Sequence, residues 1–221
     1  MRIIIDNSFI TFRNKIYRQV VGIPMGTNCA PCLADIFLHT YEYDYMQKLV
    51  GEGKIEEAKL LAQTFRFQDD CIALNDNGTF RNHYRYIYPP EMQLENTNIS
   101  IAVCNFLDLR ISVFRKKFIY RSYDKRRNFG FEICNYPHLS GNIPWRGAYG
   151  VYMSQLVRFC DINQNRKDFV KDIQAMTSQF HNQGFEKDML KRVFAAFSVR
   201  YFYKWSKYGD NINASCSNLF D

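Results

Sequence analysis

Two adjacent carboxylates, Asp69 and Asp70, are the residues in this sequence whose type and spacing could do chemistry. They lie between two short runs rich in aromatic and apolar residues, 64–67 and 71–74, which predict a tight β-hairpin with the carboxylates at its tip. Two like charges repel each other unless a positive group lies near them, and a divalent cation such as Mg²⁺ takes carboxylate oxygens together with substrate phosphates. A plain turn that happens to contain two aspartates is the alternative, since Asp is common in turns.

The elements that would position this hairpin follow from periodicity and turn residues. A first hairpin is predicted over 9–12 and 16–20, followed by a glycine-containing loop at 22–27 and a long helix over about 28–50, with Pro31 in its first turn. The remaining predicted elements are short helices at about 54–63 and 77–87, strands at 98–103, 105–114 and 118–123, and helices at about 148–161, 166–182 and 186–204. Short loops between the last three helices favour a small helical bundle.

Charge is divided unevenly along the chain. Residues 1–109 hold 10 Lys and Arg against 13 Asp and Glu, whereas residues 110–207 hold 19 against 7. An acidic part followed by a strongly basic part predicts that the second part binds a polyanion. A solubilising surface is the alternative, although the bias is larger than solubility needs.

Three short motifs occur in a fixed order. The run Gly22-Ile23-Pro24-Met25-Gly26-Thr27, followed by Ala30-Pro31, resembles the B motif of reverse transcriptases. Phe67-Gln68-Asp69-Asp70 resembles their C motif, and Phe106-Leu107-Asp108-Leu109 resembles their E motif, the primer-grip hairpin. The whole series, over nearly all of residues 5–207, is similar to reverse transcriptases of the Penelope-like retroelement type.

The resemblance implies an α+β fold, with an antiparallel polymerase palm and packed helices followed by an α-helical thumb bundle. It implies a partial palm at residues 1–135, the thumb at 136–207 and a loosely ordered tail at 208–221. The implied activity is that of an RNA-directed DNA polymerase that transfers nucleotides with two Mg²⁺ ions. Its partners would be an RNA template with a DNA primer, or an RNA–DNA duplex, and a dNTP.

Site residues carry over from the resemblance by motif. Asp69 and Asp70 would be the catalytic, metal-binding pair. The residues implied to contact the nucleotide and template are Pro24, Met25, Gly26, Thr27 and Phe67, and those of the primer grip are Phe106, Leu107 and Asp108. Two basic turns would contact the nucleic-acid backbone, although plain solvated turns are an equal alternative: Arg115, Lys116, Lys117, Lys125, Arg126 and Arg127.

The sequence departs from the family pattern in several places. Phe67 stands where Tyr is usual, and Gln68 is polar where an apolar residue is usual. The third metal-binding aspartate of the A motif and the fingers have no counterpart before Gly22, and Asp6 is not assigned to that role. Two carboxylates on one hairpin cannot readily fix two Mg²⁺ ions, so we expect this truncated chain to be inactive by itself. The alternative is a non-catalytic nucleic-acid-binding relic that uses the basic thumb.

The remaining composition bounds the environment of the chain. Seven cysteines without a second pair to complete a zinc site are expected to be reduced and mostly buried, which favours an intracellular protein, nuclear or cytoplasmic. No apolar run approaches the ~18 residues of a membrane span, so no membrane partner is expected. The four histidines are far apart in the sequence and are expected to be structural or exposed.

Overall fold

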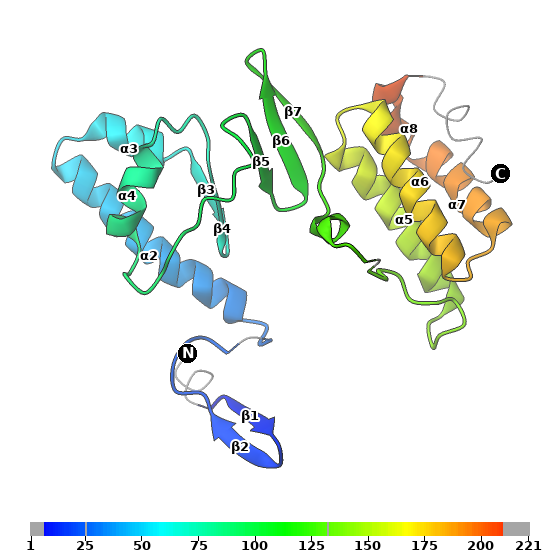
Figure 1. Ribbon diagram of the computed structural model, residues 1–221, viewed down its shortest axis with the longest axis horizontal. Helices are drawn as coiled ribbons and strands as arrows, with labels where there is room; N and C mark the ends of the chain where they lie inside the picture. Colours follow the sequence, from blue (N-terminus) through cyan, green and yellow to red (C-terminus); the bar gives the residue numbers. More distant parts are fainter. Residues whose placement is uncertain (1–6, 25, 132, 210–221) are drawn as a thin grey trace. The chain divides into compact units, whose positions relative to one another are not determined.

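The computed structural model describes residues 7–24, 26–131 and 133–209, and the chain divides into two compact units, Met1–Asn96 and Thr97–Asp221 (Figure 1). Helices and small antiparallel sheets make up both units, as expected for a mixed α+β protein. The division falls earlier than residue 135, because the three-stranded sheet belongs to the same unit as the C-terminal helices. The predicted palm and thumb boundaries stay predictions, and the predicted tail lies outside the described residues from 210 onward.

The first unit opens with a hairpin of β1 (Phe9–Phe12) and β2 (Lys15–Arg18). The strands are joined by a two-residue turn, Arg13 and Asn14, both with positive φ (48° and 61°). Two positive φ values are the signature of the type I′ turn, whose twist matches that of the strands. The second strand therefore starts one residue before the predicted Ile16.

Three helices form the core of the first unit. The long helix α2 (Ala30–Gly51) has Pro31 in its first turn, as predicted, and the chain leaves it through Gly53 with φ of 75°. Helices α3 (Ile55–Leu61) and α4 (Thr79–Ile87) also form where they are expected. Their buried apolar side chains, with that of Tyr88, make one cluster: Leu49, Ala58, Leu61, Ile87 and Tyr88.

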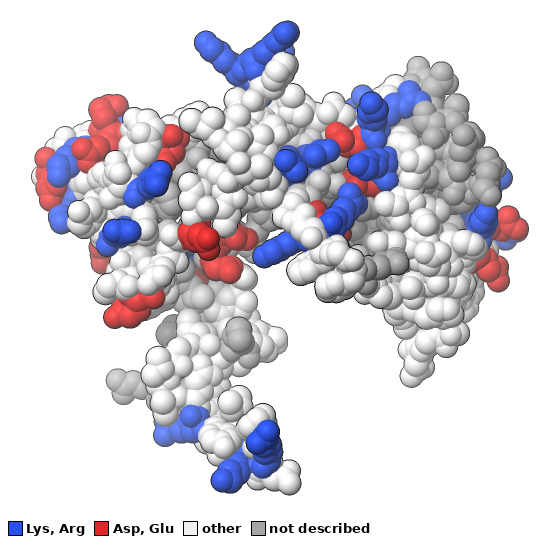
Figure 2. All heavy atoms as spheres, viewed as in Figure 1, with Lys and Arg blue, Asp and Glu red and all other residues white. Residues whose placement is uncertain are grey.

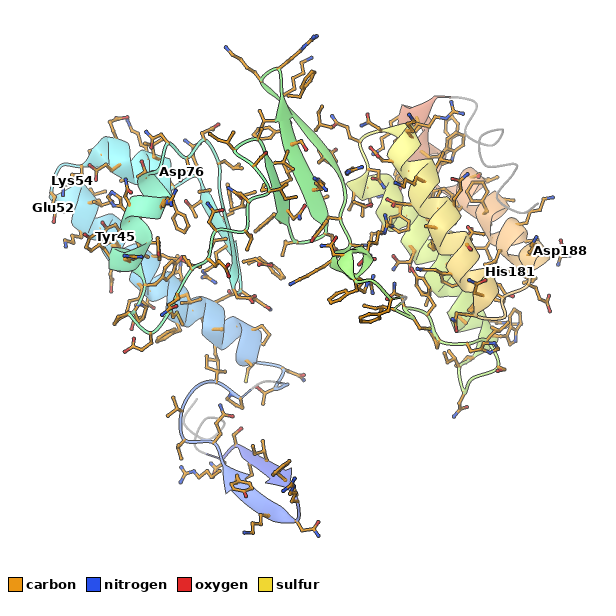
Figure 3. All side chains as sticks on the ribbon, viewed as in Figure 1. Tyr45, Glu52, Lys54, Asp76, His181 and Asp188 are labelled. Carbon is orange, nitrogen blue, oxygen red and sulfur yellow. The ribbon has the colours of Figure 1, made fainter. Side chains whose placement is uncertain are left out.

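A polar chain links the same three helices. Tyr45 of α2, labelled in Figure 3, has its hydroxyl 2.8 Å from Nδ1 of His83 on α4, whose Nε2 lies 3.6 Å from a carboxylate oxygen of Glu57 on α3. Burial raises the pKa of Tyr45, so the phenol is held protonated and is not an activated nucleophile. His83 is therefore a structural histidine, as expected. Glu52 and Lys54 pair at 2.8 Å where the chain leaves α2 (Figure 3).

The second unit begins with a sheet in the order β5-β6-β7, formed by Val103–Phe106, Leu109–Phe114 and Lys117–Ser122. Two predicted strands are wrong here. Residues 98–103 form only an isolated bridge between Ser100 and Val103. The predicted strand 105–114 is broken by a turn at Leu107 and Asp108, because Leu107 takes a positive φ (52°) and Phe106 pairs with Leu109 across it.

The helices of the second unit are α5 (Trp145–Ile162), α6 (Arg166–Asn182), α7 (Lys187–Arg200) and the short α8 (Phe202–Trp205). The last predicted helix is interrupted at Tyr201. Aromatic side chains dominate the core, among them Tyr152, Phe169, Phe180 and Phe197. Trp205 is buried and donates its indole N–H to the Ser198 carbonyl at 2.7 Å, whereas Phe202 and Tyr203 are exposed.

A buried carboxylate joins the sheet to the helices within this unit. Asp172 of α6 is 3% exposed and accepts hydrogen bonds from Ser122 Oγ at the end of β7, from Asn163 Nδ2 (2.8 Å) and from Arg127 (2.9 Å). A second link pairs Asp108 with Arg158 of α5 at 2.6 Å. A buried charge with this many partners is well compensated and holds its neighbours in one arrangement.

Candidate functional site

The hairpin that carries the two carboxylates forms as predicted. Strand β3 (Thr64–Phe67) pairs with β4 (Asp70–Ala73), and Phe67 lies opposite Asp70. The two-residue loop consists of Gln68 and Asp69, so Asp70 is already the first residue of β4. Gln68 takes a φ of 55°, in the left-handed region that side chains other than glycine rarely occupy. The tip is thus a tight turn under backbone strain.

The tip of this hairpin faces a hollow of about 880 Å³, which we call the loop–hairpin hollow. It is lined by the loop before α2, by the first turns of α2, by the hairpin tip and by residues 92–94, which follow α4. A volume of this size lies in the range of about 300–1,000 Å³ typical of pockets for small molecules and cofactors. All of its walls belong to the first unit.

The hollow brings together some of the predicted nucleotide-site residues and leaves out others. Gly26, Thr27 and Asp69 line it, although more than forty residues separate the loop from the hairpin. Gly26 has a φ of 89°, which requires glycine. Three predicted residues are not among the lining side chains: Pro24, Phe67 and Asp70. Met25 lies outside the described residues.

The residues that do not line the hollow have other surroundings. Pro24 is buried, and its carbonyl accepts a hydrogen bond from Thr27 Oγ1 at 3.2 Å, which braces the loop. Phe67 is 55% exposed, so its ring does not pack in the core of the first unit. Asp70 is exposed beside the tip. Its carboxylate is free to approach a ligand from outside the hollow.

Arg66, which the sequence analysis did not single out, fixes the hairpin to α2. Its guanidinium is 10% exposed and pairs with Glu42 at 2.6 Å and with Asp35 at 2.7 Å, both on α2. Its Nη1 also donates to the Gln68 carbonyl in the loop of the hairpin (3.3 Å). Hydrogen bonding to Glu42 raises the pKa of Arg66, so this cation is permanent. Because Arg66 also lines the hollow, it places a positive charge in the same wall as Asp69.

Two neutral groups complete this wall. The Tyr88 hydroxyl donates to Glu42 at 2.8 Å. Burial is the main cause that raises the pKa of Tyr88, and the hydrogen bond to the Glu42 carboxylate is the second. Burial also raises the pKa of the Cys71 thiol. Both groups therefore stay protonated at neutral pH, and neither supplies a nucleophile or a base. The carboxylate that lines the hollow is that of Asp69.

The metal-binding capacity of these residues is limited. Over residues 7–24, 26–131 and 133–209 the structure contains no group of three or more His, Cys, Asp or Glu side chains that could hold a metal ion. Asp69 and Asp70 supply two carboxylates of the hard-oxygen type that Mg²⁺ prefers. Asp35 and Glu42 lie on the nearby helix, but both carboxylates are engaged in ion pairs with Arg66. The pair thus suits a cation that takes its remaining ligands from water and substrate phosphates.

The predicted primer-grip residues occupy the β5–β6 turn of the second unit. Phe106 ends β5, and Leu107 and Asp108 form the two-residue loop. Leu107 is an exposed apolar side chain at the tip of the turn. Asp108 pairs with Arg158 and its carbonyl accepts from Tyr123 N at 2.7 Å, so this carboxylate is engaged within the protein and has a structural role.

The basic residues predicted to contact a nucleic-acid backbone differ in their surroundings. Arg115 and Lys116 form the β6–β7 turn, both with positive φ (48° and 62°), and they are exposed together with Lys117 and Lys125. In Figure 2, blue side chains project at the tip of the β6–β7 hairpin, and a separate group of blue side chains lies on the visible face of the second unit. Arg126 and Arg127, in contrast, pair with Asp124 at 2.8 Å and with Asp172 at 2.9 Å.

A second, smaller pocket was not anticipated from the sequence. It measures about 200 Å³ and is lined by residues of β6, β7, α6 and the turn after β7. Three of its basic residues are Arg110, Arg121 and Lys171, and we call it the arginine pocket. The sequence held a signal for it. Once the turn at Arg115 and Lys116 is recognised, the hairpin register places Arg110 opposite Arg121.

The cysteines are less buried than expected. The six within the described residues are all free thiols, and of these only Cys160 is buried, so the prediction of mostly buried cysteines is wrong. Of the others, Cys71 and Cys104 lie on short strands, and Cys32 lies on an exposed part of α2. In the part of the chain that the structure describes, no helix is long and apolar enough to cross a membrane.

Comparisons with known proteins add no relative. Neither a scan of protein-family models, nor a search of the curated proteins, nor a search of the solved structures finds a match to this chain. The resemblance to reverse transcriptases therefore rests on the sequence motifs alone.

Proposed function

We propose that this chain is the nucleotide- and duplex-binding part of an RNA-directed DNA polymerase of the Penelope-like retroelement type. The observation that carries the proposal is the loop–hairpin hollow. Gly26 and Thr27 come from the B-like motif and Asp69 comes from the C-like motif, and all three line the same hollow. A hairpin with two aspartates could form in many proteins, but a glycine loop facing its tip across a pocket of nucleotide size supports a polymerase site.

The proposed chemistry is nucleotidyl transfer. When bound, Mg²⁺ would activate the primer 3′-hydroxyl and stabilise the leaving pyrophosphate. Asp69 would bind the cation from inside the hollow, and Asp70 would approach it from the exposed side of the tip. Two adjacent carboxylates leave most of the ligand positions of two such ions unfilled, so the reaction requires a further carboxylate besides this pair.

The remaining residues of the hollow would bind and orient the nucleotide. Gly26 has no side chain, and no other atom of the described residues lies within 4 Å of the position that a Cβ would take. A base or sugar could therefore approach the backbone at this position. Arg66 would hold the hairpin at a fixed distance from α2 through its pairs with Glu42 and Asp35.

The second unit would bind the duplex. It holds 19 Lys and Arg against 10 Asp and Glu, and its exposed β6–β7 turn carries three cations in sequence. Cations on a surface bind phosphates without reading base sequence, as a polymerase requires. The assignments of residues 1–135 as palm and of residues 136–207 as thumb belong to this proposal, and their boundary differs from the division between the two units.

A nucleotide-binding measurement tests the proposal on the chain itself. A fluorescent dNTP is titrated with Mg²⁺ or with EDTA, and anisotropy reports binding. We expect binding that requires Mg²⁺ and that falls about tenfold or more in Asp69→Asn, because the cation loses its ligand inside the hollow, and a tenfold change corresponds to about 1.4 kcal/mol. Asp44→Asn is the matched control, since Asp44 is an exposed carboxylate on α2 outside the hollow. Equal, Mg²⁺-independent binding by all three proteins would refute the proposed site.

Primer extension gives the second arm. The assay uses a primed RNA template, dNTPs and Mg²⁺, and we expect any extension product to disappear in Asp69→Asn. Extension that persists in this variant would show that the carboxylates of the hairpin are not the catalytic ones.

A non-catalytic nucleic-acid-binding protein is the second candidate, and the charge of the second unit favours it. This candidate predicts duplex binding that is strongly salt-dependent and unaffected by EDTA. It also predicts that Asp69→Asn leaves both duplex and dNTP titrations unchanged. The two candidates therefore differ in the dNTP titration, where only the polymerase site depends on Asp69.

A further inference from the structure

Two arginines face each other across the hairpin of β6 and β7. The antiparallel register makes Arg110 and Arg121 direct partners, so their side chains leave the same face of the sheet. Like charges directly opposite each other are destabilising in a sheet. Such a pair is tolerated more easily when an anion lies between the two guanidinium groups, as at sites where arginines bind phosphate.

The surroundings of this pair leave positive charge in excess. Arg121 has a partner, Asp168 of α6, but at 3.7 Å, which is a loose ion pair. Lys171, one turn further along α6, lines the same pocket. Among the described residues, Arg110 and Lys171 have no carboxylate within ion-pair distance, whereas Arg126 and Arg127 are already paired with Asp124 and Asp172.

The walls of the pocket are fixed. Ser122, Arg127 and Asp172 line it, and these residues form the network around the buried Asp172 carboxylate that joins β7 to α6. Fully buried Asn163 donates to the same carboxylate oxygen of Asp172 as Ser122, whereas Arg127 donates to the other oxygen. Because Asp172 is held by these partners, this part of the wall is rigid, and little order has to be created there when an anion binds.

We propose that the arginine pocket is the binding site for one phosphate group, contributed by the backbone of a nucleic-acid duplex. The pocket of about 200 Å³ is too small for a nucleotide but accommodates a tetrahedral oxyanion with its water. Arg110 and Arg121 would donate from the sheet and Lys171 from the helix. The choice of a duplex as the source of the phosphate rests on the proposed function, whereas the phosphate chemistry rests on the pocket alone.

The salt dependence of duplex binding tests this site. Anisotropy of a labelled RNA–DNA duplex is measured at several salt concentrations between about 50 and 200 mM for the wild type and for the double variant Arg110→Gln/Lys171→Gln. Each phosphate contact contributes roughly −0.7 to −0.9 to the slope of log K against log salt. We expect the double variant to bind more weakly with a slope smaller in magnitude by about one contact. An unchanged slope would overturn the proposal.

Two further variants guard against a general charge effect. Lys191→Gln removes an exposed cation of α7, outside the arginine pocket, and should leave the slope unchanged. Asp168→Asn removes the partner of Arg121 and should strengthen duplex binding at low salt. If Lys191→Gln changes the salt-dependence slope by half as much as the double variant does, the two pocket residues have no specific role and the site is contradicted. Circular dichroism should show the double variant fully folded, since neither residue makes an ion pair.

Titration with inorganic phosphate separates this inference from the proposed function. NMR signals of the Arg121 side chain should shift with phosphate in the wild type and not in the double variant, which keeps Arg121. If the wild type binds no duplex but shows these shifts, the proposed function fails and the duplex is rejected as the source of the phosphate. If the wild type binds duplex and the double variant has the same salt-dependence slope, the arginine pocket is rejected as a phosphate site and the proposed function stands.

Discussion

Replacing Arg66 with methionine is expected to detach the carboxylate-bearing hairpin from α2. Methionine keeps much of the length of the side chain but removes its charge and all of its donors. The Arg66 guanidinium donates to Glu42 at 2.6 Å, to Asp35 at 2.7 Å and to the Gln68 carbonyl at 3.3 Å. The variant therefore leaves two carboxylates of the helix without their cation and the loop of the hairpin without its link.

The magnitude depends on how exposed each carboxylate is. The Asp35 side chain is 52% exposed, so its pair is worth less than about 1 kcal/mol. Glu42 is 27% exposed, and a hydrogen bond to a charged group contributes about 1.5–3 kcal/mol. Tyr88 still donates to Glu42 in the variant, which reduces the penalty for the unpaired carboxylate. We expect Arg66→Met to lower the free energy of unfolding of the first unit by about 2–3 kcal/mol.

The two units allow a clean assay. Both tryptophans of the chain, Trp145 and Trp205, belong to the second unit, so tryptophan fluorescence in urea reports the unfolding of that unit alone. Far-UV circular dichroism reports both units. Arg66→Met should shift the dichroism transition of the first unit to lower urea and leave the fluorescence transition in place. A double-mutant cycle with Glu42→Gln should give a coupling energy of about 1.5–3 kcal/mol.

Two results would refute this reasoning. A coupling energy near zero between Arg66 and Glu42 would mean that the pair does not hold the hairpin. An equal loss in the fluorescence transition would mean that Arg66 acts on the whole chain. Asp35→Asn serves as the matched variant, since it should cost less than about 1 kcal/mol on the grounds of its exposure.

Three other predictions follow from single groups. Gln68→Gly should raise the free energy of unfolding of the first unit, measured by urea denaturation, by about 0.5–1 kcal/mol. Relief of the left-handed φ at Gln68 (~1–2 kcal/mol) exceeds the chain-entropy cost of glycine (~0.5–1 kcal/mol). A loss of stability would contradict this prediction. Hydrogen bonding to Arg126 lowers the pKa of Asp124 in the folded protein. The stability that Asp124 contributes is therefore present above its unfolded-state pKa of about 3.9, and it is lost as the pH falls through the folded-state pKa. Asp124→Asn should thus be less stable than the wild type at neutral pH, with no difference in strong acid; a gap that persists in acid would rule out the ion pair as its cause. Burial raises the pKa of Cys160 to about 12, so its thiol should be unreactive in the folded protein. Iodoacetamide should modify exposed Cys32 in the native protein and Cys160 only after unfolding, as detected by mass spectrometry. Rapid labelling of Cys160 in the native protein would contradict its burial.

The sequence predicts local structure well wherever turn chemistry is explicit. Pro31 lies in the first turn of the long helix as expected, and the aromatic runs around Asp69 and Asp70 form the predicted hairpin. The Leu107–Asp108 turn shows the limit. Leu107 is not a common turn former, so the run 105–114 has the pattern of one strand, and only the positive φ of Leu107 reveals the break.

The candidate site was less accessible to prediction than the fold. The approach of Gly26 and Thr27 to Asp69 is implied by the motif series, but Arg66 is an ordinary strand residue until its distances to Glu42 and Asp35 are known. The wall of the hollow at residues 92–94 belongs to a segment without regular structure, whose path depends on long-range packing. Arg110 and Arg121 could have been paired from the register, whereas the contribution of Lys171 required the packing of α6 on the sheet.

The buried carboxylate Asp172 has a mechanical consequence for the second unit. It ties the end of β7 to α6, while the Asp108–Arg158 pair ties the β5–β6 turn to α5. A sheet anchored at two separate points cannot slide or twist independently of the helices. A displacement of the helices should therefore carry the sheet with it and move the tip at Leu107 in the same step.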